Sequence, residues 1–315
     1  MKLLVTGAAG YLGSTLVPVL LRAGHAVTAI DSLTKPGFLL HVAAEPGFAF
    51  HRVDVTDTAQ VRPLLSGVDA VVHLAAIVDE QECAADEARA YRVNTWATQQ
   101  LVALSREAAV RRFLFVSTAS IYGASSHDAP ATEGDPANAR TIYAKSKLQA
   151  EAAVVGAAAA SFVPMVFRFA SLMGVSPIVR YDGVMNRFLL HAARDGTIPV
   201  RGGTSWRPCL HVRDAARAAR AWLELDRPSP AGTLLNVGEG NYQKRHLAQV
   251  AAGAFPSVKI QMDDVAGDRD YCVDFTKSRQ LLGGYAEAGP DVAAAELSRA
   301  FLGGLLQPEP DASAP

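Results

Sequence analysis

The sequence predicts an α/β protein whose centre is a doubly wound parallel sheet with helices on both faces. Short segments rich in strand-forming residues alternate with Ala- and Leu-rich segments of helical length in the first half of the chain. The first of these segments leads into a glycine-rich turn at residues 7–13, and a helical stretch follows. A chain of 315 residues, half of them hydrophobic, is long enough for one large or two modest domains.

Six strands are expected up to residue 167, at residues 2–6, 26–31, 49–53, 70–73, 113–117 and 163–167. The helical stretches between them are expected at residues 12–22, 58–65, 85–108 and 143–159. Right-handed crossovers would assemble these elements into a doubly wound sheet. After Arg168 the regular alternation stops, with one helical stretch near residues 184–194, and a strand pattern returns at residues 233–237.

This pattern predicts two domains of unequal size. Residues 1–168, together with about 208–238, are expected to form a Rossmann-type domain that binds a dinucleotide. Residues from about 169 to 207 and from 239 to 306 are expected to build a smaller C-terminal α/β lobe that binds the substrate. Residues 307–315 are rich in Pro, Ala and acidic side chains and are expected to be a flexible tail.

The glycine-rich turn indicates a cofactor site. Gly7, Gly10 and Gly13 follow a strand and open a helix, so the backbone can approach a pyrophosphate and the helix N-terminus can face its charge. Tyr11 and Leu12 lie within this turn. The alternative interpretation is that the glycines only form a turn and bind no cofactor. The position of Asp31 argues against that alternative.

Asp31 ends the second expected strand, where a carboxylate can accept hydrogen bonds from the adenosine ribose. It would also repel a 2′-phosphate, so NAD is favoured over NADP. Two further strand ends are expected at the same edge of the sheet, and their cofactor-binding candidates are Asp54, Val55, Leu74, Ala75 and Ala76. His73 is interpreted as a packed strand-end histidine rather than a base.

Tyr143 and Lys147 form a Tyr-x-x-x-Lys pair, which on a helix places both side chains on one face. Ionising a free tyrosine at pH 7 costs about 4 kcal/mol. The Lys147 ammonium and an oxidised nicotinamide are expected to lower the Tyr143 pKa and make the phenolate a general base. The partner hydroxyl is left open among Ser117, Thr118 and Ser120, and Tyr122 is a second candidate acid or base.

Composition limits the other classes of function. The sequence contains no apolar run of about 18 residues, so we expect no membrane span. The net charge is −1 and basic residues are not clustered, which argues against a nucleic-acid partner. Its three cysteines, Cys83, Cys209 and Cys272, have neither disulfide nor metal-ligand spacing. With no signal-peptide pattern, these features predict a cytoplasmic protein without a metal.

The motifs taken together resemble the extended short-chain dehydrogenase/reductases, specifically the NAD-dependent nucleotide-sugar epimerases and dehydratases of the UDP-glucose 4-epimerase type. The resemblance covers nearly the whole chain and rests on G-A-A-G-Y-L-G at 7–13, H-L-A-A at 73–76, V-N at 93–94, S-T-A-S-I-Y-G at 117–123, Y-A-K-S-K at 143–147 and R-P-C-L-H-V-R-D at 207–214. It implies NAD as cofactor and Thr118, Tyr143 and Lys147 as catalytic residues. It also implies that Tyr143 and Lys147 contact the cofactor, with Lys147 holding the nicotinamide ribose, and that Asn94 is a helix residue that supports the active site.

The resemblance also implies a nucleotide sugar, most often a UDP- or dTDP-hexose, bound by the C-terminal lobe. Arg207 and Arg269 correspond to arginines that contact the diphosphate, since guanidinium groups bind phosphate oxygens in pairs. Ser171 and Asn186 are further substrate candidates, although Ser171 stands where many relatives have a longer asparagine.

Dehydratases of this family usually carry Asp-Glu after the catalytic threonine, where this chain has Ala119 and Ser120. Without those carboxyl groups, water elimination lacks its proton-transfer residues. The sequence therefore predicts an NAD-dependent epimerase acting at C4 through a 4-keto intermediate. The alternatives are a dehydrogenase, ketoreductase or dehydratase of the same family, or a non-catalytic NAD-binding regulator. Alanine-rich helices near residues 94–108 and 143–159 predict a homodimer.

Overall fold

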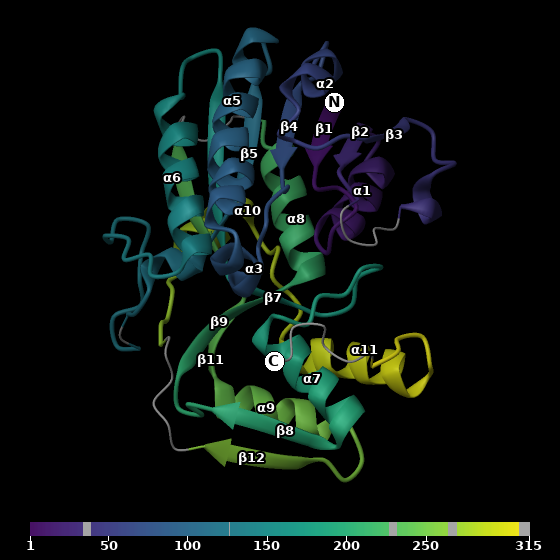
Figure 1. The fold of residues 1–315 in the computed structure, drawn as a ribbon, viewed down its shortest axis with the longest axis vertical. Coiled ribbons are helices and arrows are strands. Elements are labelled where there is room, and N and C mark those ends of the chain that lie inside the picture. The colour runs from purple at the N-terminus through teal and green to yellow at the C-terminus, as the bar shows by residue number, and fades with distance from the viewer. Residues whose placement is uncertain (34–38, 126, 227–231, 264–269, 309–315) are drawn as a thin grey trace.

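The computed structural model describes residues 1–33, 39–125, 127–226, 232–263 and 270–308. A seven-stranded parallel sheet with helices on both faces forms the larger unit, and a smaller lobe lies at one end of it (Figure 1). The strand order is β10-β6-β5-β4-β1-β2-β3. These strands are β1 (Lys2–Thr6), β2 (Ala26–Asp31), β3 (Phe48–Arg52), β4 (Ala70–His73), β5 (Arg112–Thr118), β6 (Val163–Phe169) and β10 (Thr233–Val237). The predicted doubly wound fold is confirmed.

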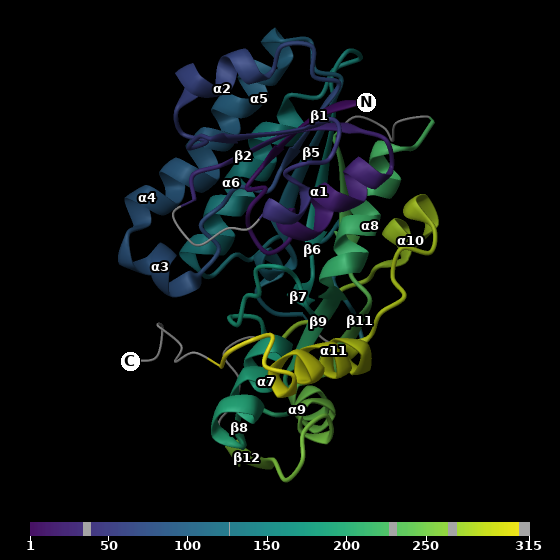
Figure 2. The same cartoon turned by 90° about the vertical axis from the view of Figure 1, so that its right-hand side faces the viewer.

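Helices cover the sheet on both faces because successive strand side chains point to opposite sides. In β1, Leu3 and Val5 join one hydrophobic cluster and Leu4 joins another. The helices α1 (Gly13–Arg22) and α8 (Val212–Leu223) lie on one face, and α2 (Thr58–Leu64), α5 (Ala97–Glu107) and α6 (Ile142–Gly156) lie on the other (Figure 2). Strands buried on both faces read as continuous apolar runs, which is why the sequence located them well.

The smaller lobe contains two short sheets and three helices packed around Met185, Leu189, Ile198, Leu247 and Leu297. Its strands are β7 (Ser171–Met173), β8 (Thr197–Arg201), β9 (Trp206–His211), β11 (Gly240–Gln243) and β12 (Lys259–Asp263). Its helices are α7 (Val184–Asp195), α9 (Lys244–Gly253) and α11 (Pro290–Leu302), while α10 (Thr276–Leu282) contacts β10. The chain leaves the large sheet after β6 and returns to it at β10.

The single helix expected at residues 85–108 is wrong, since that segment contains several elements. They are α3 (Glu80–Ala85), α4 (Glu87–Tyr91), a π-helical turn η2 (Arg92–Trp96) and α5. The break occurs at Asp86, which has a φ of −140° and whose side chain accepts a hydrogen bond from the Arg89 N–H. An aspartate that caps a new helix in this way ends the one before it. Two single turns, η1 (Leu40–Val42) and η3 (Ala119–Tyr122), complete the described elements.

Every helix in the described residue ranges is too short or too polar to cross a membrane.

Candidate active site

The glycine-rich turn needs glycine at two of its three positions. Gly7 has a φ of 67°, and a Cβ there would lie 2.6 Å from the Ala75 backbone nitrogen. A Cβ on Gly13 would overlap the Gly7 carbonyl oxygen, whereas at Gly10 the nearest atom would be 3.4 Å away. The helix α1 begins at Gly13, so its N-terminus lies beside this close-packed turn. The turn fits the pyrophosphate of a dinucleotide, which needs a bare backbone and a helix N-terminus.

Asp31 lies at the carboxyl end of β2, directly beside the glycine turn. Its Oδ2 atom accepts a hydrogen bond from the Ala9 N–H at 3.0 Å, and its Oδ1 atom accepts one from the Leu33 N–H at 2.9 Å. Each carboxylate oxygen has a second lone pair, and the side chain is partly exposed. The carboxylate is therefore fixed at the cofactor turn and can still accept hydrogen bonds from ribose hydroxyls.

The other predicted cofactor residues follow β3 and β4 at the same edge of the sheet. Asp54 is exposed and its Oδ1 atom accepts from the Thr56 N–H and hydroxyl, both at 2.8 Å, while Val55 is buried. Leu74 and Ala75 are attached to β1, because their N–H groups donate to the Thr6 carbonyl oxygen at 3.1 Å and the Thr6 hydroxyl at 3.2 Å. Ala76 is the next residue in the same loop.

Thr118 and Tyr143 come together where β5 ends and α6 begins, and Lys147 follows one turn later on α6. Thr141 caps α6, with its hydroxyl accepting from the Ala144 N–H at 3.2 Å, so Tyr143 lies in the first turn. The Tyr143 phenol is hydrogen-bonded to the Thr118 side chain. One turn later, the Lys147 ammonium lies 4.0 Å from the centre of the Phe115 ring, and its residue is only 2% exposed.

Burial dominates the electrostatics of this pair. It raises the pKa of Tyr143 to about 12, although the Arg180 charge and the Thr118 hydrogen bond act in the opposite direction. It lowers the pKa of Lys147 to about 7, against the nearby Glu151 carboxylate. The expected lowering of the Tyr143 pKa counts the charge of an oxidised nicotinamide as well as that of Lys147. The protein groups by themselves do not produce it, because burying the phenol outweighs the charges around it. The charge of an oxidised nicotinamide would come in addition to these groups.

The candidate hydroxyl groups are distinguished by their hydrogen-bond partners. The Ser117 hydroxyl donates to Glu151 at 2.5 Å, and the Tyr122 hydroxyl donates to the Asn236 side chain at 2.7 Å. Burial also raises the pKa of Tyr122. Thr118 and Ser120 are hydrogen-bonded to each other at 2.9 Å, and of the two it is Thr118 that contacts Tyr143. The arrangement favours Thr118 as the hydroxyl that acts with the tyrosine.

Asn94 holds the loop after β4 against α6. Its Oδ1 atom accepts from the Ile77 N–H at 2.8 Å, and its Nδ2 atom donates to the Ile77 carbonyl at 2.8 Å and to the Ser146 hydroxyl at 3.0 Å. It lies in the π-helical turn, where the widened backbone places the amide between these two segments. Because Ser146 precedes Lys147, Asn94 fixes the helix that carries the pair.

His73 is buried and both of its ring nitrogens are engaged. Nδ1 is hydrogen-bonded to the Thr6 hydroxyl at 2.7 Å and Nε2 to the Thr98 hydroxyl at 2.9 Å. Burial lowers the pKa of His73 to about 3, with the Lys147 charge acting in the same direction. A neutral ring with both nitrogens hydrogen-bonded connects β1 to α5, as the interpretation of a packed histidine requires.

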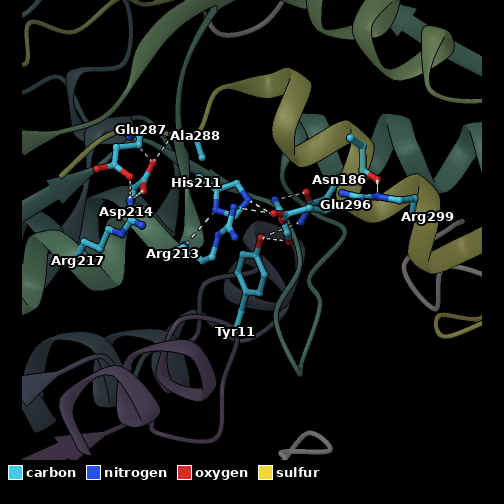
Figure 3. Close-up of polar contacts among 12 residues, drawn as sticks. Tyr11, Asn186, His211, Arg213, Asp214, Arg217, Glu287, Ala288, Glu296 and Arg299 are labelled. Atoms are coloured by element: carbon cyan, nitrogen blue, oxygen red, sulfur yellow. Dashed lines mark hydrogen bonds and ion pairs between the residues drawn. The ribbon is translucent and has the colours of Figure 1, made fainter. Parts of the chain in front are cut away.

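Tyr11 connects the glycine turn to the smaller lobe. Its hydroxyl donates to the Gly174 carbonyl at 2.7 Å and accepts from the Asn186 Nδ2 atom at 3.1 Å (Figure 3). Gly174 in turn packs against the His211 ring, where a Cβ would overlap Nε2. The His211 Nδ1 atom accepts from the Arg213 N–H, so Nε2 carries the proton and donates to Glu296 at 3.1 Å (Figure 3).

The chain is similar in sequence and in fold to known proteins. The sequence model of the NAD dependent epimerase/dehydratase family matches residues 3–238. The chain belongs to this family. It is 33% identical to a dTDP-glucose 4,6-dehydratase of Streptomyces griseus, over 89% of this chain and 88% of the relative. It is 31% identical to a UDP-glucose 4-epimerase of Streptomyces lividans, over 76% of each chain.

Among solved structures, the dTDP-glucose 4,6-dehydratase DesIV of Streptomyces venezuelae, with NAD bound, superposes with a TM-score of 0.85. It is 28% identical, and the match covers 98% of this chain and 99% of DesIV. NAD is the cofactor of the epimerase/dehydratase family. Gly7, Gly13 and Asp31 of this family member fit it, for the steric and hydrogen-bonding reasons given above.

The structure places the predicted substrate residues of this epimerase/dehydratase in different environments. Arg207 is 7% exposed, donates to the Trp206 carbonyl at 2.7 Å and lies 5.8 Å from the centre of the Tyr271 ring. Ser171 is partly buried at the start of β7. Arg269 lies outside the described residues.

Asn186 is fully buried and its amide bonds only with protein groups in the contacts described. Its Oδ1 atom accepts from the Gly174 N–H at 3.0 Å, and its Nδ2 atom donates to Tyr11 and to the Arg180 carbonyl at 2.8 Å. These bonds use both amide donors within the protein. Substrate binding by Asn186 stays a prediction, and the geometry gives the residue a role in joining the two lobes.

Sequence reasoning missed two charged residues near the Tyr143–Lys147 pair. Arg180 lies in the segment between β7 and α7, where its charge acts on both Tyr11 and Tyr143, and it is ion-paired with Asp182 through Nε at 3.0 Å. This segment belongs to the lobe expected to bind the substrate, but nothing in the local sequence singled out Arg180. Glu151 could have been found, because it follows Lys147 at the same four-residue spacing that relates Lys147 to Tyr143.

Proposed function

We propose that this protein is an NAD-dependent nucleotide-sugar epimerase that inverts C4 of a UDP- or dTDP-hexose through a 4-keto intermediate. The observation that carries the proposal is the chemistry of the two residues after Thr118. Ala119 is fully buried, and the Ser120 hydroxyl is hydrogen-bonded to Thr118. Neither side chain supplies the carboxyl group that water elimination across C5 and C6 would need. Removal and return of hydrogen at one carbon needs bound NAD for the hydride and, from the protein, only the Thr118, Tyr143 and Lys147 set.

In the proposed reaction, Tyr143 takes the proton of the C4 hydroxyl and later returns it to the C4 oxygen. Thr118 orients that hydroxyl, and Lys147 supplies positive charge one turn away from the phenolate. Bound NAD supplies the acceptor and donor of the C4 hydride. Inversion requires that the keto sugar present its opposite face before the hydride returns. Ser171, Asn186, Arg207 and Arg269 remain candidates for holding the nucleotide during this turn.

A 4,6-dehydratase is the second candidate, and Asp182 favours it. The Asp182 charge raises the pKa of Tyr143, so a carboxylate lies within electrostatic range of the catalytic tyrosine. It is ion-paired with Arg180, which reduces its strength as a base. A dehydrogenase or ketoreductase that releases its cofactor is the third candidate and differs only in the fate of NAD.

One assay distinguishes the three candidates. The purified protein is supplied with NAD and incubated with UDP-glucose, UDP-galactose, dTDP-glucose and dTDP-galactose, and the products are followed by NMR and mass spectrometry. C4 inversion without a steady change in nicotinamide absorbance supports the epimerase. A product lighter by one water identifies the dehydratase, and a steady absorbance change identifies the dehydrogenase. No inversion with any of these sugars would contradict the proposal, and Tyr143→Phe serves as the inactive control.

We also propose a homodimer formed through the helices that flank the active site. A groove of about 940 Å³ lies over α4, η2, α5 and α6, and Arg92, Trp96 and Gln149 are among its lining residues. Trp96 is 38% exposed there, with the Arg92 guanidinium 5.4 Å from its ring centre. A large exposed aromatic side chain in a groove is typical of a protein interface.

The cysteines are free and buried, which supports a cytoplasmic location.

A further inference from the structure

Glu151 is a buried carboxylate immediately behind the catalytic lysine. It lies one turn after Lys147 on α6 and is 3% exposed. It accepts hydrogen bonds from the Ser117 hydroxyl at 2.5 Å and from Arg168, through Nη2 at 2.7 Å and Nε at 3.2 Å. Ser117 and Arg168 are paired directly across β5 and β6, so the sheet presents both donors to the same point of the helix. The carboxylate therefore has one fixed position.

Arg168 is also held by groups other than Glu151. Its Nη1 atom donates to the Tyr122 hydroxyl at 2.8 Å, and that hydroxyl donates to the Asn236 side chain on β10. Arg168 is 5% exposed, so its charge depends on Glu151 for neutralisation. These contacts connect β10, at the edge of the sheet, to α6, which carries Tyr143 and Lys147. The groups involved have no role in the reaction proposed above.

The groups that face the Lys147 ammonium explain why a negative charge matters there. The Phe115 ring lies beneath it, His73 on β4 is near and neutral, and Glu151 is the carboxylate whose charge stabilises the ammonium. Burial of the Lys147 side chain favours loss of its ammonium proton. An aromatic face alone offsets only part of the cost of burying an ammonium.

We propose that Glu151 is a positioning residue for the reaction: held by Ser117 and Arg168, it supplies the fixed negative charge that favours the ammonium form of the buried Lys147 side chain, one turn from Tyr143 on α6. The inference rests on the proposed catalytic role of the Tyr143–Lys147 pair. It assigns a function to a carboxylate that does not touch the reacting atoms. A merely structural role would require the ion pair for folding and would leave the protonation of Lys147 unchanged.

The test is a direct titration of Lys147 in the full-length protein. Lysine labelled with ¹³C at Cε is incorporated, the Lys147 signal is assigned with Lys147→Arg, and its chemical shift is followed against pH. In the wild type the midpoint is expected near the value of about 7 set by burial and Glu151. Glu151→Gln is expected to lower the midpoint by about 1 pH unit, a tenfold loss in proton affinity. An unchanged midpoint in folded Glu151→Gln protein would overturn the proposal.

Two controls separate charge from structure. Ser117→Ala removes a neutral hydrogen bond to the carboxylate but keeps its charge, so the midpoint is expected to stay near that of the wild type. Glu107→Gln removes an exposed carboxylate on α5 that is ion-paired with Arg62, and it is also expected to leave the midpoint unchanged. A fall of the same size in either control would contradict a specific effect of Glu151.

Glu151→Gln leaves Arg168 without its counter-charge and can fail to fold. In that case the double variant Glu151→Gln/Arg168→Met replaces the whole ion pair by neutral residues, and the Lys147 midpoint is again expected to fall. A wild-type midpoint in the double variant would overturn the proposal. The titration needs no sugar substrate, so absence of epimerase activity in the wild type would count against the proposed function and not against this inference.

Discussion

The Tyr11 hydroxyl donates a hydrogen bond to the Gly174 carbonyl at 2.7 Å, and this contact joins the cofactor turn to the smaller lobe. The same hydroxyl accepts from Asn186. Tyr11→Phe removes the hydroxyl and leaves both partners buried without it, which is expected to cost about 1–3 kcal/mol of unfolding free energy. Because the turn loses its anchor, NAD binding is expected to weaken by about tenfold, measured by calorimetric titration.

Tyr285→Phe is the matched control for this prediction. The Tyr285 hydroxyl is also buried and hydrogen-bonded, to the Gly238 carbonyl at 3.0 Å and to Ser278 at 2.8 Å, away from the glycine turn. It is expected to lower stability by a similar amount and leave the NAD dissociation constant unchanged. Equal losses of NAD affinity in the two variants would show that the effect of Tyr11 is only a general loss of stability.

Gly13→Ala is expected to abolish NAD binding, because the new Cβ would overlap the Gly7 carbonyl oxygen in the turn. Gly10→Ala meets its nearest atom at 3.4 Å and is expected to retain NAD with at most a modest loss. Calorimetric titration of both proteins with NAD checks the pair, and circular dichroism confirms that each is folded. Normal NAD affinity in Gly13→Ala would show that the turn can open without cost.

Tyr143→Phe is expected to lower kcat by about 10²–10⁴-fold, the range of general acid–base catalysis, while NAD remains bound. Tyr122→Phe tests the rival tyrosine, whose hydroxyl bonds to Arg168 and Asn236, and is expected to lower stability with little change in kcat. Steady-state kinetics on the sugar that the product assay identifies decide between them. Full activity in Tyr143→Phe would remove the basis of the proposed chemistry.

Acid is expected to destabilise the protein through His73. Burial holds the folded-state pKa of His73 near 3, whereas an unfolded histidine titrates near 6.5. Below pH 6.5 the unfolded chain binds a proton that the folded chain rejects, so the unfolding free energy falls as the pH falls towards 3. The loss at pH 5 is about 2 kcal/mol. Urea unfolding from pH 7 to pH 4 measures it, and His73→Gln is expected to flatten this dependence.

The homodimer is expected to depend on Trp96. Trp96→Glu places a charge in the groove over α5 and α6 and is expected to yield monomers in sedimentation experiments at micromolar concentration. Met262→Glu changes a side chain on β12 that is 49% exposed and is expected to leave the assembly intact. A wild-type protein that sediments as a monomer would contradict the dimer itself.

Much of the large sheet could be predicted from the sequence, because parallel strands buried on both faces are unbroken apolar segments. The bounds of β1, β2, β4 and β10 agree with the expected ones. The break at Asp86 was missed, since an alanine-rich stretch favours one helix and the cap depends on a single side chain. The widened turn at Asn94 depends on hydrogen bonds to Ile77, a distant residue that periodicity does not reveal.

The candidate site also contains some residues that the sequence could predict and others that it could not. Residues in motifs, such as Gly7, Asp31 and Tyr143, were located because their spacing alone places them at one edge of the sheet. Arg180 was missed because the segment between β7 and α7 has no periodic pattern, and its approach to Tyr143 depends on how the two lobes pack. The strength with which burial raises the Tyr143 pKa was not foreseen, because the sequence shows neighbouring charges and not the extent of burial.

The return of the chain to the large sheet affects how the protein can be made. The helix α8 and the edge strand β10 are translated only after β7, α7, β8 and β9. Trp222 on α8 is completely buried in the hydrophobic cluster that also contains side chains of α1. A nascent chain that has reached β9 therefore exposes the part of one sheet face that α8 covers, together with the open edge of β6. For the same reason, a gene fragment that stops after β6 would give an aggregating product, and an isolated cofactor unit would need α8 and β10 joined on by a linker.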